Sequence, residues 1–124
     1  MAPNEQYNLL IESLLLAAAS ASEQVSALPD FVVVTDEVAS TFGDAFLLVP
    51  QLERAGLASR DAVTTLQELD EHFKHTPDDT IASPSSLHDH PYWEKARRLA
   101  TDALAKLGEE KRPPKLQDAT WIRG

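Results

Sequence analysis

The spacing of the apolar residues constrains the fold of this chain more than any other feature. In four segments, apolar side chains recur every three or four residues, which places them on one side of an α-helix. The segments are residues 4–27, 36–49, 60–75 and 91–107. Such helices bury their apolar sides only by packing against one another. The pattern therefore predicts an all-α, single-domain bundle of about four helices over residues 1–108.

Helix-breaking and helix-capping residues support these boundaries. Pro29 disfavours a helical residue before it, and Pro50 ends or kinks the second helix before Gly56 closes that segment. Ser59 is a typical cap for the third helix, and Pro91 is favoured in the first turn of the fourth. We expect the large core side chains to be Phe42, Phe46, Leu66, Phe73, Trp93 and Leu104.

The chain after this bundle is polar and contains proline, which predicts an irregular C-terminal tail over residues 109–124. The tail nevertheless includes Trp121 and Ile122 near its end. We expect these two side chains to pack the tail back onto the helices, since an untethered terminus is poorly ordered.

The sequence FVVV, residues 31–34, is the one run that resembles a β-strand. It is short, and no second such run exists in the sequence to pair with its backbone, so we predict no sheet. We predict instead an extended connector, then a helix that Thr35 caps and that Asp36 and Glu37 stabilise at its N-terminus. In an alternative interpretation the helix begins at Asp30, because the apolar run also fits a helical period.

Two imidazoles and a carboxylate lie close together in His88, Asp89 and His90. They fall in a predicted loop, residues 76–90, whereas a metal site usually draws converging ligands from rigid elements. We interpret Asp89 or a neighbour as the cap of the fourth helix and both imidazoles as solvated, with no metal bound. The chain has no cysteine and no nucleotide-binding, hydrolase or metalloprotease motif. We expect no catalytic residue, no cofactor and no enzyme activity.

The chain is acidic, and its charge is unevenly distributed. The formal net charge is −9, and residues 1–75 account for all of it, because acidic and basic residues balance in residues 76–124. Nucleic acids and anionic membranes bind basic surfaces, so we expect neither as a partner. The apolar N-terminal run follows no Lys or Arg and contains Glu12, which indicates a core helix of a cytoplasmic protein and not a secretion signal.

An acidic surface favours either solubility or the binding of a basic protein. On the second and third predicted helices, acidic residues lie away from the apolar side. We expect a partner-binding surface made of Asp36, Glu37, Asp44, Asp61, Glu68 and Glu71.

Two segments resemble a known class of protein. VVVTDEVASTFGDAFLLVPQLERAGL and HPYWEKARRLATDALAKL are similar to stretches of small, acidic, helical bacterial proteins, mostly uncharacterised. Some of these resemble immunity proteins, which neutralise a toxin produced by a neighbouring gene. The resemblance implies binding without catalysis, in which an acidic surface occludes the active site of a basic toxin domain. It supplies no motif that assigns a role to a single residue.

Leu9 and Leu16 project from the first predicted helix on the side opposite its main apolar side. They are either covered by another part of the chain or exposed as a seam for association, since monomers tend to avoid exposed apolar strips. The alternative function is therefore a homo-oligomeric structural or adaptor protein, a weak homodimer formed through these two leucines.

Overall fold

The structure is a computed structural model that describes residues 2–114. All regular elements in this range are helical, which confirms the all-α prediction for the described part of the chain. The predicted number of about four helices is too low, because residues 2–114 form seven α-helices and one 3₁₀-helix. In chain order these are α1 (Pro3–Ala18), α2 (Ala21–Ala27), α3 (Val34–Phe46), α4 (Val49–Arg54), α5 (Arg60–Lys74), η1 (Asp79–Ala82), α6 (Ser86–Asp89) and α7 (Pro91–Lys106).

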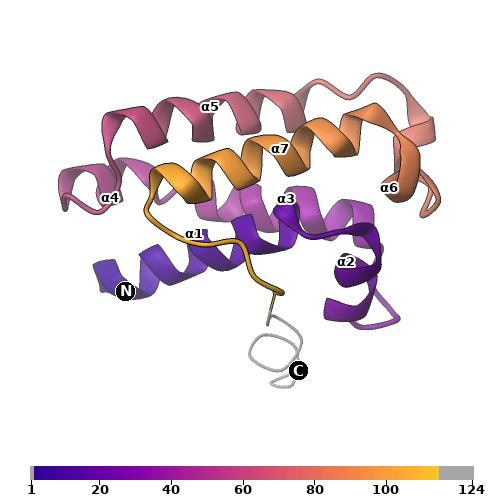
Figure 1. The fold of residues 1–124 in the computed structure, drawn as a ribbon, viewed down its shortest axis with the longest axis horizontal. Coiled ribbons are helices and arrows are strands. Elements are labelled where there is room, and N and C mark those ends of the chain that lie inside the picture. Colours follow the sequence, from indigo (N-terminus) through magenta and orange to yellow (C-terminus); the bar gives the residue numbers. More distant parts are fainter. Residues whose placement is uncertain (1, 115–124) are drawn as a thin grey trace.

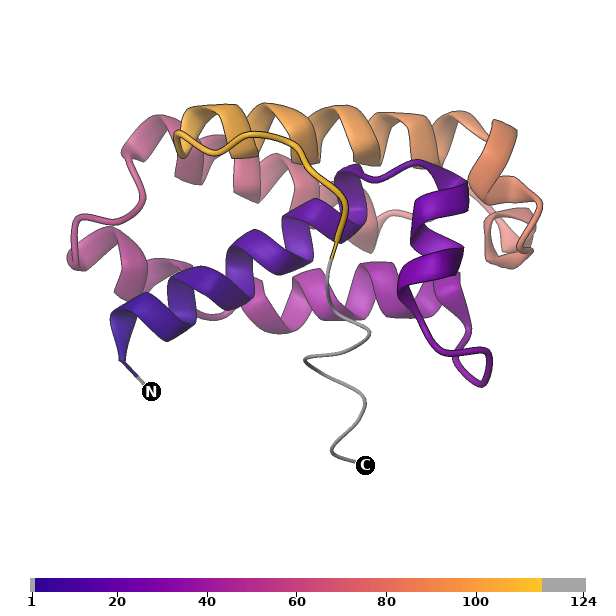
Figure 2. The ribbon, with the colours of Figure 1, turned by 60° about the horizontal axis from the view of Figure 1, so that its bottom comes forward.

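The four longest helices, α1, α3, α5 and α7, pack around a common core. Helix α1 contacts both α3 and α7, and so does α5. Helices α3 and α7 therefore lie on opposite sides of the molecule, with α7 at the front in Figure 1 and α3 along the lower edge in Figure 2. The shorter helices join and cover the ends of these four.

The first predicted helix, residues 4–27, is in fact two helices. Ala19 adopts an extended backbone with ψ 157°, which ends α1 after Ala18. Ser20 then begins α2 with a reciprocal pair of capping hydrogen bonds. Its hydroxyl accepts from the Glu23 amide at 3.2 Å, and its own amide donates to the Glu23 carboxylate at 3.0 Å. This local capping satisfies the free amides of a new helix and allows the chain to turn.

The start of α3 differs from both predictions. The helix begins at Val34, so neither the cap at Thr35 nor the alternative start at Asp30 is correct. Thr35 lies inside the first turn, and its hydroxyl donates to the carbonyl of Ala82 at 3.2 Å. A tertiary contact with η1 therefore uses the hydroxyl that the sequence predicts as a cap. Residues 30–31 form a turn and residue 32 a bend, in place of a fully extended connector.

Several predicted boundaries are confirmed. The Ser59 hydroxyl accepts from the Ala62 amide at the start of α5, and α7 begins at Pro91. Gly56 and Gly108 have φ values of 78° and 81°, the left-handed conformation that commonly closes a helix. The prediction that Pro50 ends or kinks the second helix is wrong, because α3 already ends at Phe46 and Pro50 lies in the first turn of α4.

Residues 76–90, predicted as a loop, contain η1 and α6. Trp93 holds this segment against α7, because its indole nitrogen donates to the carbonyl of Ile81 at 3.0 Å. Of the six predicted core side chains, four are buried and Phe46 and Phe73 are partly buried against the core. The buried four are Phe42, Leu66, Trp93 and Leu104.

The predicted contact of Trp121 and Ile122 lies outside the described residues. Where the described chain leaves α7, the hydroxyl of Tyr7 donates to the Glu109 carboxylate at 2.7 Å, which attaches the chain to α1. Burial, together with this hydrogen bond, raises the pKa of Tyr7 to about 12. Among residues 2–114, no helix is both long and apolar enough to cross a membrane.

Candidate protein-binding surface

The six carboxylates predicted to bind a partner lie on two different helices. Helix α3 presents Asp36 and Asp44 to solvent, and Glu37 is half-buried beside them. Helix α5 presents the other three, Asp61, Glu68 and Glu71, all exposed. The two groups differ in what surrounds them.

The carboxylates of α5 share their helix with the basic residues Arg60 and Lys74, and one of the three, that of Asp61, has an ammonium partner. Asp61 is 3.6 Å from the ammonium of Lys106 on α7, which also donates to the hydroxyl of Thr65 at 2.7 Å. The carboxylate of Glu71 is 3.6 Å from Nδ1 of His75. The Lys106 ammonium reduces the negative potential around Asp61 that a distant partner experiences, whereas Glu68 has no ion pair among residues 2–114.

The carboxylates of α3 lie in a part of the chain without any basic residue. The first Lys, Arg or His in the sequence is Arg54, so residues 1–53 contain acidic residues alone among the charged types. Among residues 2–114, no ion pair involves Asp36, Glu37 or Asp44. Of the two groups, only the α5 group therefore includes a carboxylate that is paired with an ammonium, that of Asp61.

Exposed apolar side chains lie at both ends of the same helix. Val33, at the N-terminal cap of α3, is 56% exposed, and Leu47, at its C-terminal cap, is 75% exposed. Phe31, in the connector before α3, is 79% exposed. Single exposed apolar side chains are common on monomers, so the two ends of α3 contribute to a binding surface only together with the acidic residues between them.

These side chains share one side of α3. Residues three and four apart lie on the same side of a helix. The exposed residues Val33, Asp36, Ser40, Asp44 and Leu47 follow that spacing. The opposite side is buried and consists of Thr35, Val38, Phe42 and Ala45. We call the exposed side, defined by those first five residues together with Glu37, the α3 face.

The sequence prediction identified the acids of the α3 face but missed its apolar ends. In the sequence, Val33 belongs to the strand-like run FVVV, and no motif assigns a role to Leu47. The sequence could have indicated that both residues are exposed, because helical spacing places neither of them on the buried side with Val38, Phe42 and Ala45.

The predicted Leu9/Leu16 seam is not an exposed strip in the structure. Leu16 is 0% exposed, and Leu9 is 46% exposed. Leu16 lies in the C-terminal half of α1, where α2, α3 and α7 surround the helix and bury residues on every side. Homodimer formation through both leucines would require unpacking of the core.

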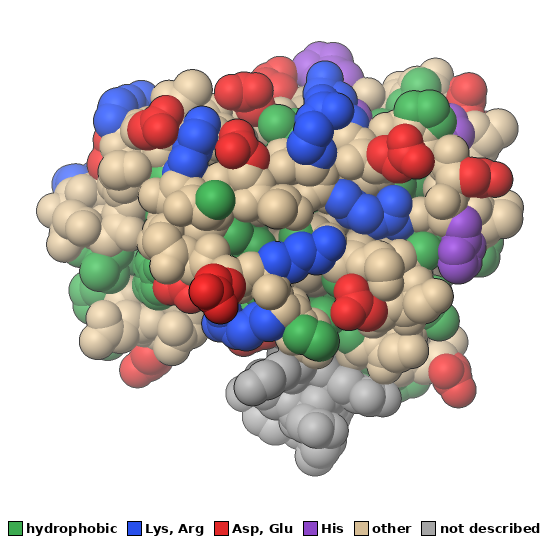
Figure 3. All heavy atoms as spheres, in the orientation of Figure 1, with side chains coloured by type: hydrophobic (Ala, Val, Ile, Leu, Met, Phe, Trp, Pro, Cys, Tyr) green, Lys and Arg blue, Asp and Glu red, His purple; other side chains and the backbone are tan. Residues whose placement is uncertain are grey.

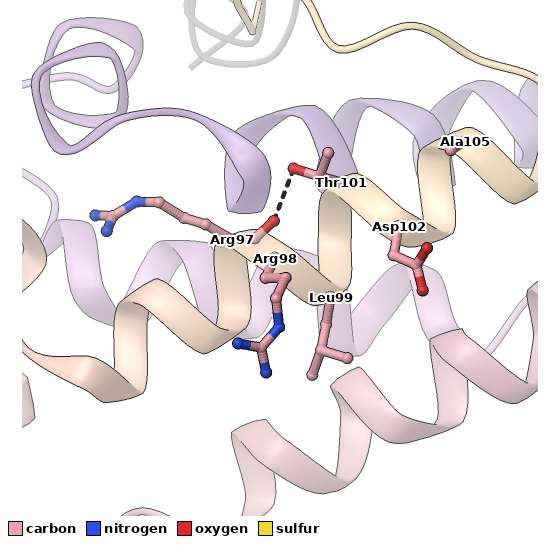
Figure 4. Close-up of a pocket in the computed structure, with 6 residues that line it drawn as sticks. All are labelled: Arg97, Arg98, Leu99, Thr101, Asp102 and Ala105. Atoms are coloured by element: carbon pink, nitrogen blue, oxygen red, sulfur yellow. Dashed lines mark hydrogen bonds between the residues drawn. The ribbon is translucent and has the colours of Figure 1, made fainter.

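The opposite side of the molecule, formed by α7, has a mixed charge. Figure 3 shows Lys and Arg side chains over this face with Asp and Glu between them. A surface hollow of about 620 Å³ lies here, lined by Arg97, Arg98, Leu99, Thr101, Asp102 and Ala105. In Figure 4 the side chains of Arg97 and Asp102 point in different directions.

Arg97 has a structural role beside this hollow. Its Nε donates to the carbonyl of Ala19 at 3.0 Å, and its terminal nitrogen donates to the carbonyl of Leu87. Burial lowers the pKa of Arg97, and nearby Glu94 partly opposes that change. This guanidinium therefore joins the end of α1 to α6 and is already satisfied by two carbonyls.

The histidines of residues 88–90 do not converge. His88 is exposed, and Nδ1 of His90 accepts a hydrogen bond from the Tyr92 amide at 3.1 Å. A neighbour of Asp89 thus caps α7, as one form of the prediction stated, although His90 is half-buried and not fully solvated. Within residues 2–114, no three His, Cys, Asp or Glu side chains gather in a way that could hold a metal ion.

No protein-family model, curated protein or solved structure matches the chain.

Proposed function

We propose that this protein is a small, acidic protein-binding module whose α3 face binds a basic surface of another protein. The observation that supports this most is the contrast between the two acidic helices. Asp61 on α5 pairs with the ammonium of Lys106, whereas Asp36, Glu37 and Asp44 have no ion pair within the described residues.

Unpaired carboxylates on one side of a molecule attract a basic partner from a distance. Complementary potentials increase the association rate and disfavour wrong partners more than they raise the final affinity. The exposed apolar residues at the ends of α3 supply binding energy that charge alone does not, because apolar anchors lose water on contact with the partner.

The class of partner that we propose is a toxin domain with a basic active site. The resemblance of residues 32–57 and 90–107 to immunity-type proteins supports this class, and the first of these segments contains α3. In this mechanism the module performs no chemistry. It covers the basic groups with which the toxin holds its substrate. Its own acidic side chains pair with those groups, so the substrate can no longer bind there.

The proposal is tested with the full-length chain immobilised and exposed to an extract of the cells that produce it. A captured protein is identified, purified and titrated against the wild-type chain and against two double variants. In the test variant, Asp36→Lys is combined with Asp44→Lys. We expect its affinity to fall by at least about tenfold, because two attractions become repulsions.

The matched control combines Glu94→Lys with Glu110→Lys. Both double variants change the net charge equally, and each replaces one acidic residue in the first turn of a helix, Asp36 in α3 and Glu94 in α7. Their costs to folding through the helix dipole are therefore similar. Equal losses of affinity in the two variants would show that only net charge matters, and that α3 is not the binding surface.

A further inference from the structure

Helix α3 contains a glycine that its own fold does not require. Gly43 lies inside the helix, where glycine is destabilising relative to alanine because it loses more backbone freedom on folding. A Cβ atom added at Gly43 would meet nothing within 4 Å among the described atoms. Its φ is not in the left-handed region, which belongs only to Gly56 and Gly108 among the described glycines. Within residues 2–114, neither packing nor backbone conformation explains the missing side chain.

Gly43 adjoins the α3 face. It follows Ser40 by three residues and precedes Leu47 by four, so the three lie along the same side of the helix. Glycine and serine leave the backbone of α3 accessible in the middle of the face, between the apolar residues at its ends. Two helices approach one another more closely where the side chains at the contact are small.

The face forms a continuous line along α3, which we call the seam. Val33, Glu37, Ser40, Asp44 and Leu47 follow one another in alternating steps of four and three residues. A helix packed along this line would meet apolar side chains at the two ends and polar or small ones between them. From Val33 to Leu47 the seam extends about 21 Å along the axis, at ~1.5 Å per residue.

From these features we infer that the partner inserts an amphipathic, basic α-helix along the α3 face. This inference rests on the proposed function and specifies the element of the partner that binds. Apolar side chains at the two ends of the partner helix contact Val33 and Leu47, and Lys or Arg side chains between them pair with Asp36 and Asp44. A small residue of the partner lies against Gly43.

Charge complementarity favours such a helix over a second copy of this chain. Two α3 faces brought together would place carboxylates against carboxylates, because residues 1–53 contain no basic residue. The α7 side contains Lys95 and Arg98, but Glu94 and Asp102 lie among them. Glu37 lies in the seam itself, so an uncharged or acidic helix would leave its carboxylate unpaired on contact.

The inference is tested with a synthetic probe. The probe is an 18-residue peptide with Leu and Ala on one side of its helix and Lys on the flanks, labelled for fluorescence anisotropy. The comparison peptide has the same composition in an order that gives no apolar side. We expect the amphipathic peptide to bind the full-length chain at least about tenfold more tightly, because both peptides share the same charge attraction.

Variants of the chain locate the contact. Gly43→Gln fills the centre of the face with a good helix former, and Leu47→Ser removes an apolar end. We expect each to weaken binding of the amphipathic peptide at least about fivefold and to leave the helical content unchanged. Ala105→Gln adds the same side chain at an exposed position of α7 and should leave the affinity unchanged.

Equal binding of the two peptides, or Gly43→Gln binding like the wild type, would overturn the inference. Failure of both peptides to bind would overturn it as well. A dimer in light scattering that Leu47→Ser dissociates would assign the face to a second copy instead. In each of these cases, the proposed function would still be supported if the Asp36→Lys, Asp44→Lys variant failed to bind the partner that the wild-type chain captures.

Discussion

His72 of α5 and Tyr92 of α7 contact each other both by a hydrogen bond and by ring stacking. Nε2 of His72 lies 2.7 Å from the carbonyl oxygen of Tyr92, and the ring centroids are 4.4 Å apart. Since a carbonyl only accepts, Nε2 donates and the proton on that nitrogen is fixed. The pair joins α5 to α7 beside the rings of Phe73 and Trp93. It makes the packing of these two helices sensitive to the charge of one imidazole.

Stability should therefore depend on the charge of His72. Burial lowers the pKa of His72 from its usual value of 6.5, and the nearby charges of Lys95 and Arg98 act in the same direction, against the hydrogen bond to Tyr92. Between the two pKa values the unfolded chain binds more protons than the folded one. The free energy of unfolding should then fall as the pH falls from above 6.5 through the folded-state pKa.

Urea unfolding at several pH values on both sides of 6.5 measures this dependence. His72→Gln keeps a side-chain N–H donor and cannot titrate, so it should remove part of the pH dependence. If the free energy of unfolding of His72→Gln depended on pH as that of the wild type does, His72 would not be the cause of the dependence.

The two leucines of the predicted seam should respond differently to truncation. Leu16→Ala removes a fully buried side chain and should lower the free energy of unfolding by about 2–5 kcal/mol. Leu9→Ala changes a half-exposed side chain and should cost less than about 1 kcal/mol, which urea unfolding can distinguish. Similar small effects for both leucines, with loss of a dimer in light scattering, would restore the seam and contradict the packing of α1.

Two glycine substitutions should have opposite effects on stability. Gly43→Ala should stabilise the free protein by about 0.5–1 kcal/mol, because the helix gains a better former and the new methyl group meets no atom. Gly56→Ala should destabilise it by about 1 kcal/mol, because φ is 78° there. Thermal unfolding of the two variants beside the wild type tests both signs. A destabilising Gly43→Ala would mean that the glycine has a role in the fold.

The helices that the sequence predicted best have strong local signals at both ends. Helix α5 follows Ser59, and α7 lies between Pro91 and Gly108, so capping and backbone preference decided their bounds. The break between α1 and α2 also had a readable signal, Ser20 followed three residues later by Glu23. It was missed because apolar residues continue at helical spacing across it.

Other features depend on tertiary contacts that no local pattern contains. The short helices η1 and α6 are below the length at which an isolated helix is stable, and Trp93 supports them from α7. Leu16 lies off the main apolar stripe of α1, yet it is buried because neighbours surround that half of the helix.

The charge of the surface was predictable, but its pairing was not. The excess of acidic residues before Arg54 is visible in the sequence. The ion pair between Asp61 and Lys106 joins residues far apart in the chain, and it exists only because α5 packs against α7. The contrast between Asp61, which has an ammonium partner, and the three acids of α3, which have no ion pair among residues 2–114, therefore required the structure.

The central claim is that the α3 face is the binding surface, and a residue-by-residue map of the bound state tests it most directly. Backbone amide resonances of the full-length chain are followed by NMR while the captured partner is added. We predict that the changes concentrate in residues 31–47 and diminish as salt is added, because screening limits the field of exposed charges to about 8 Å at physiological ionic strength. Changes concentrated on α7, with residues 31–47 unaffected, would contradict the claim.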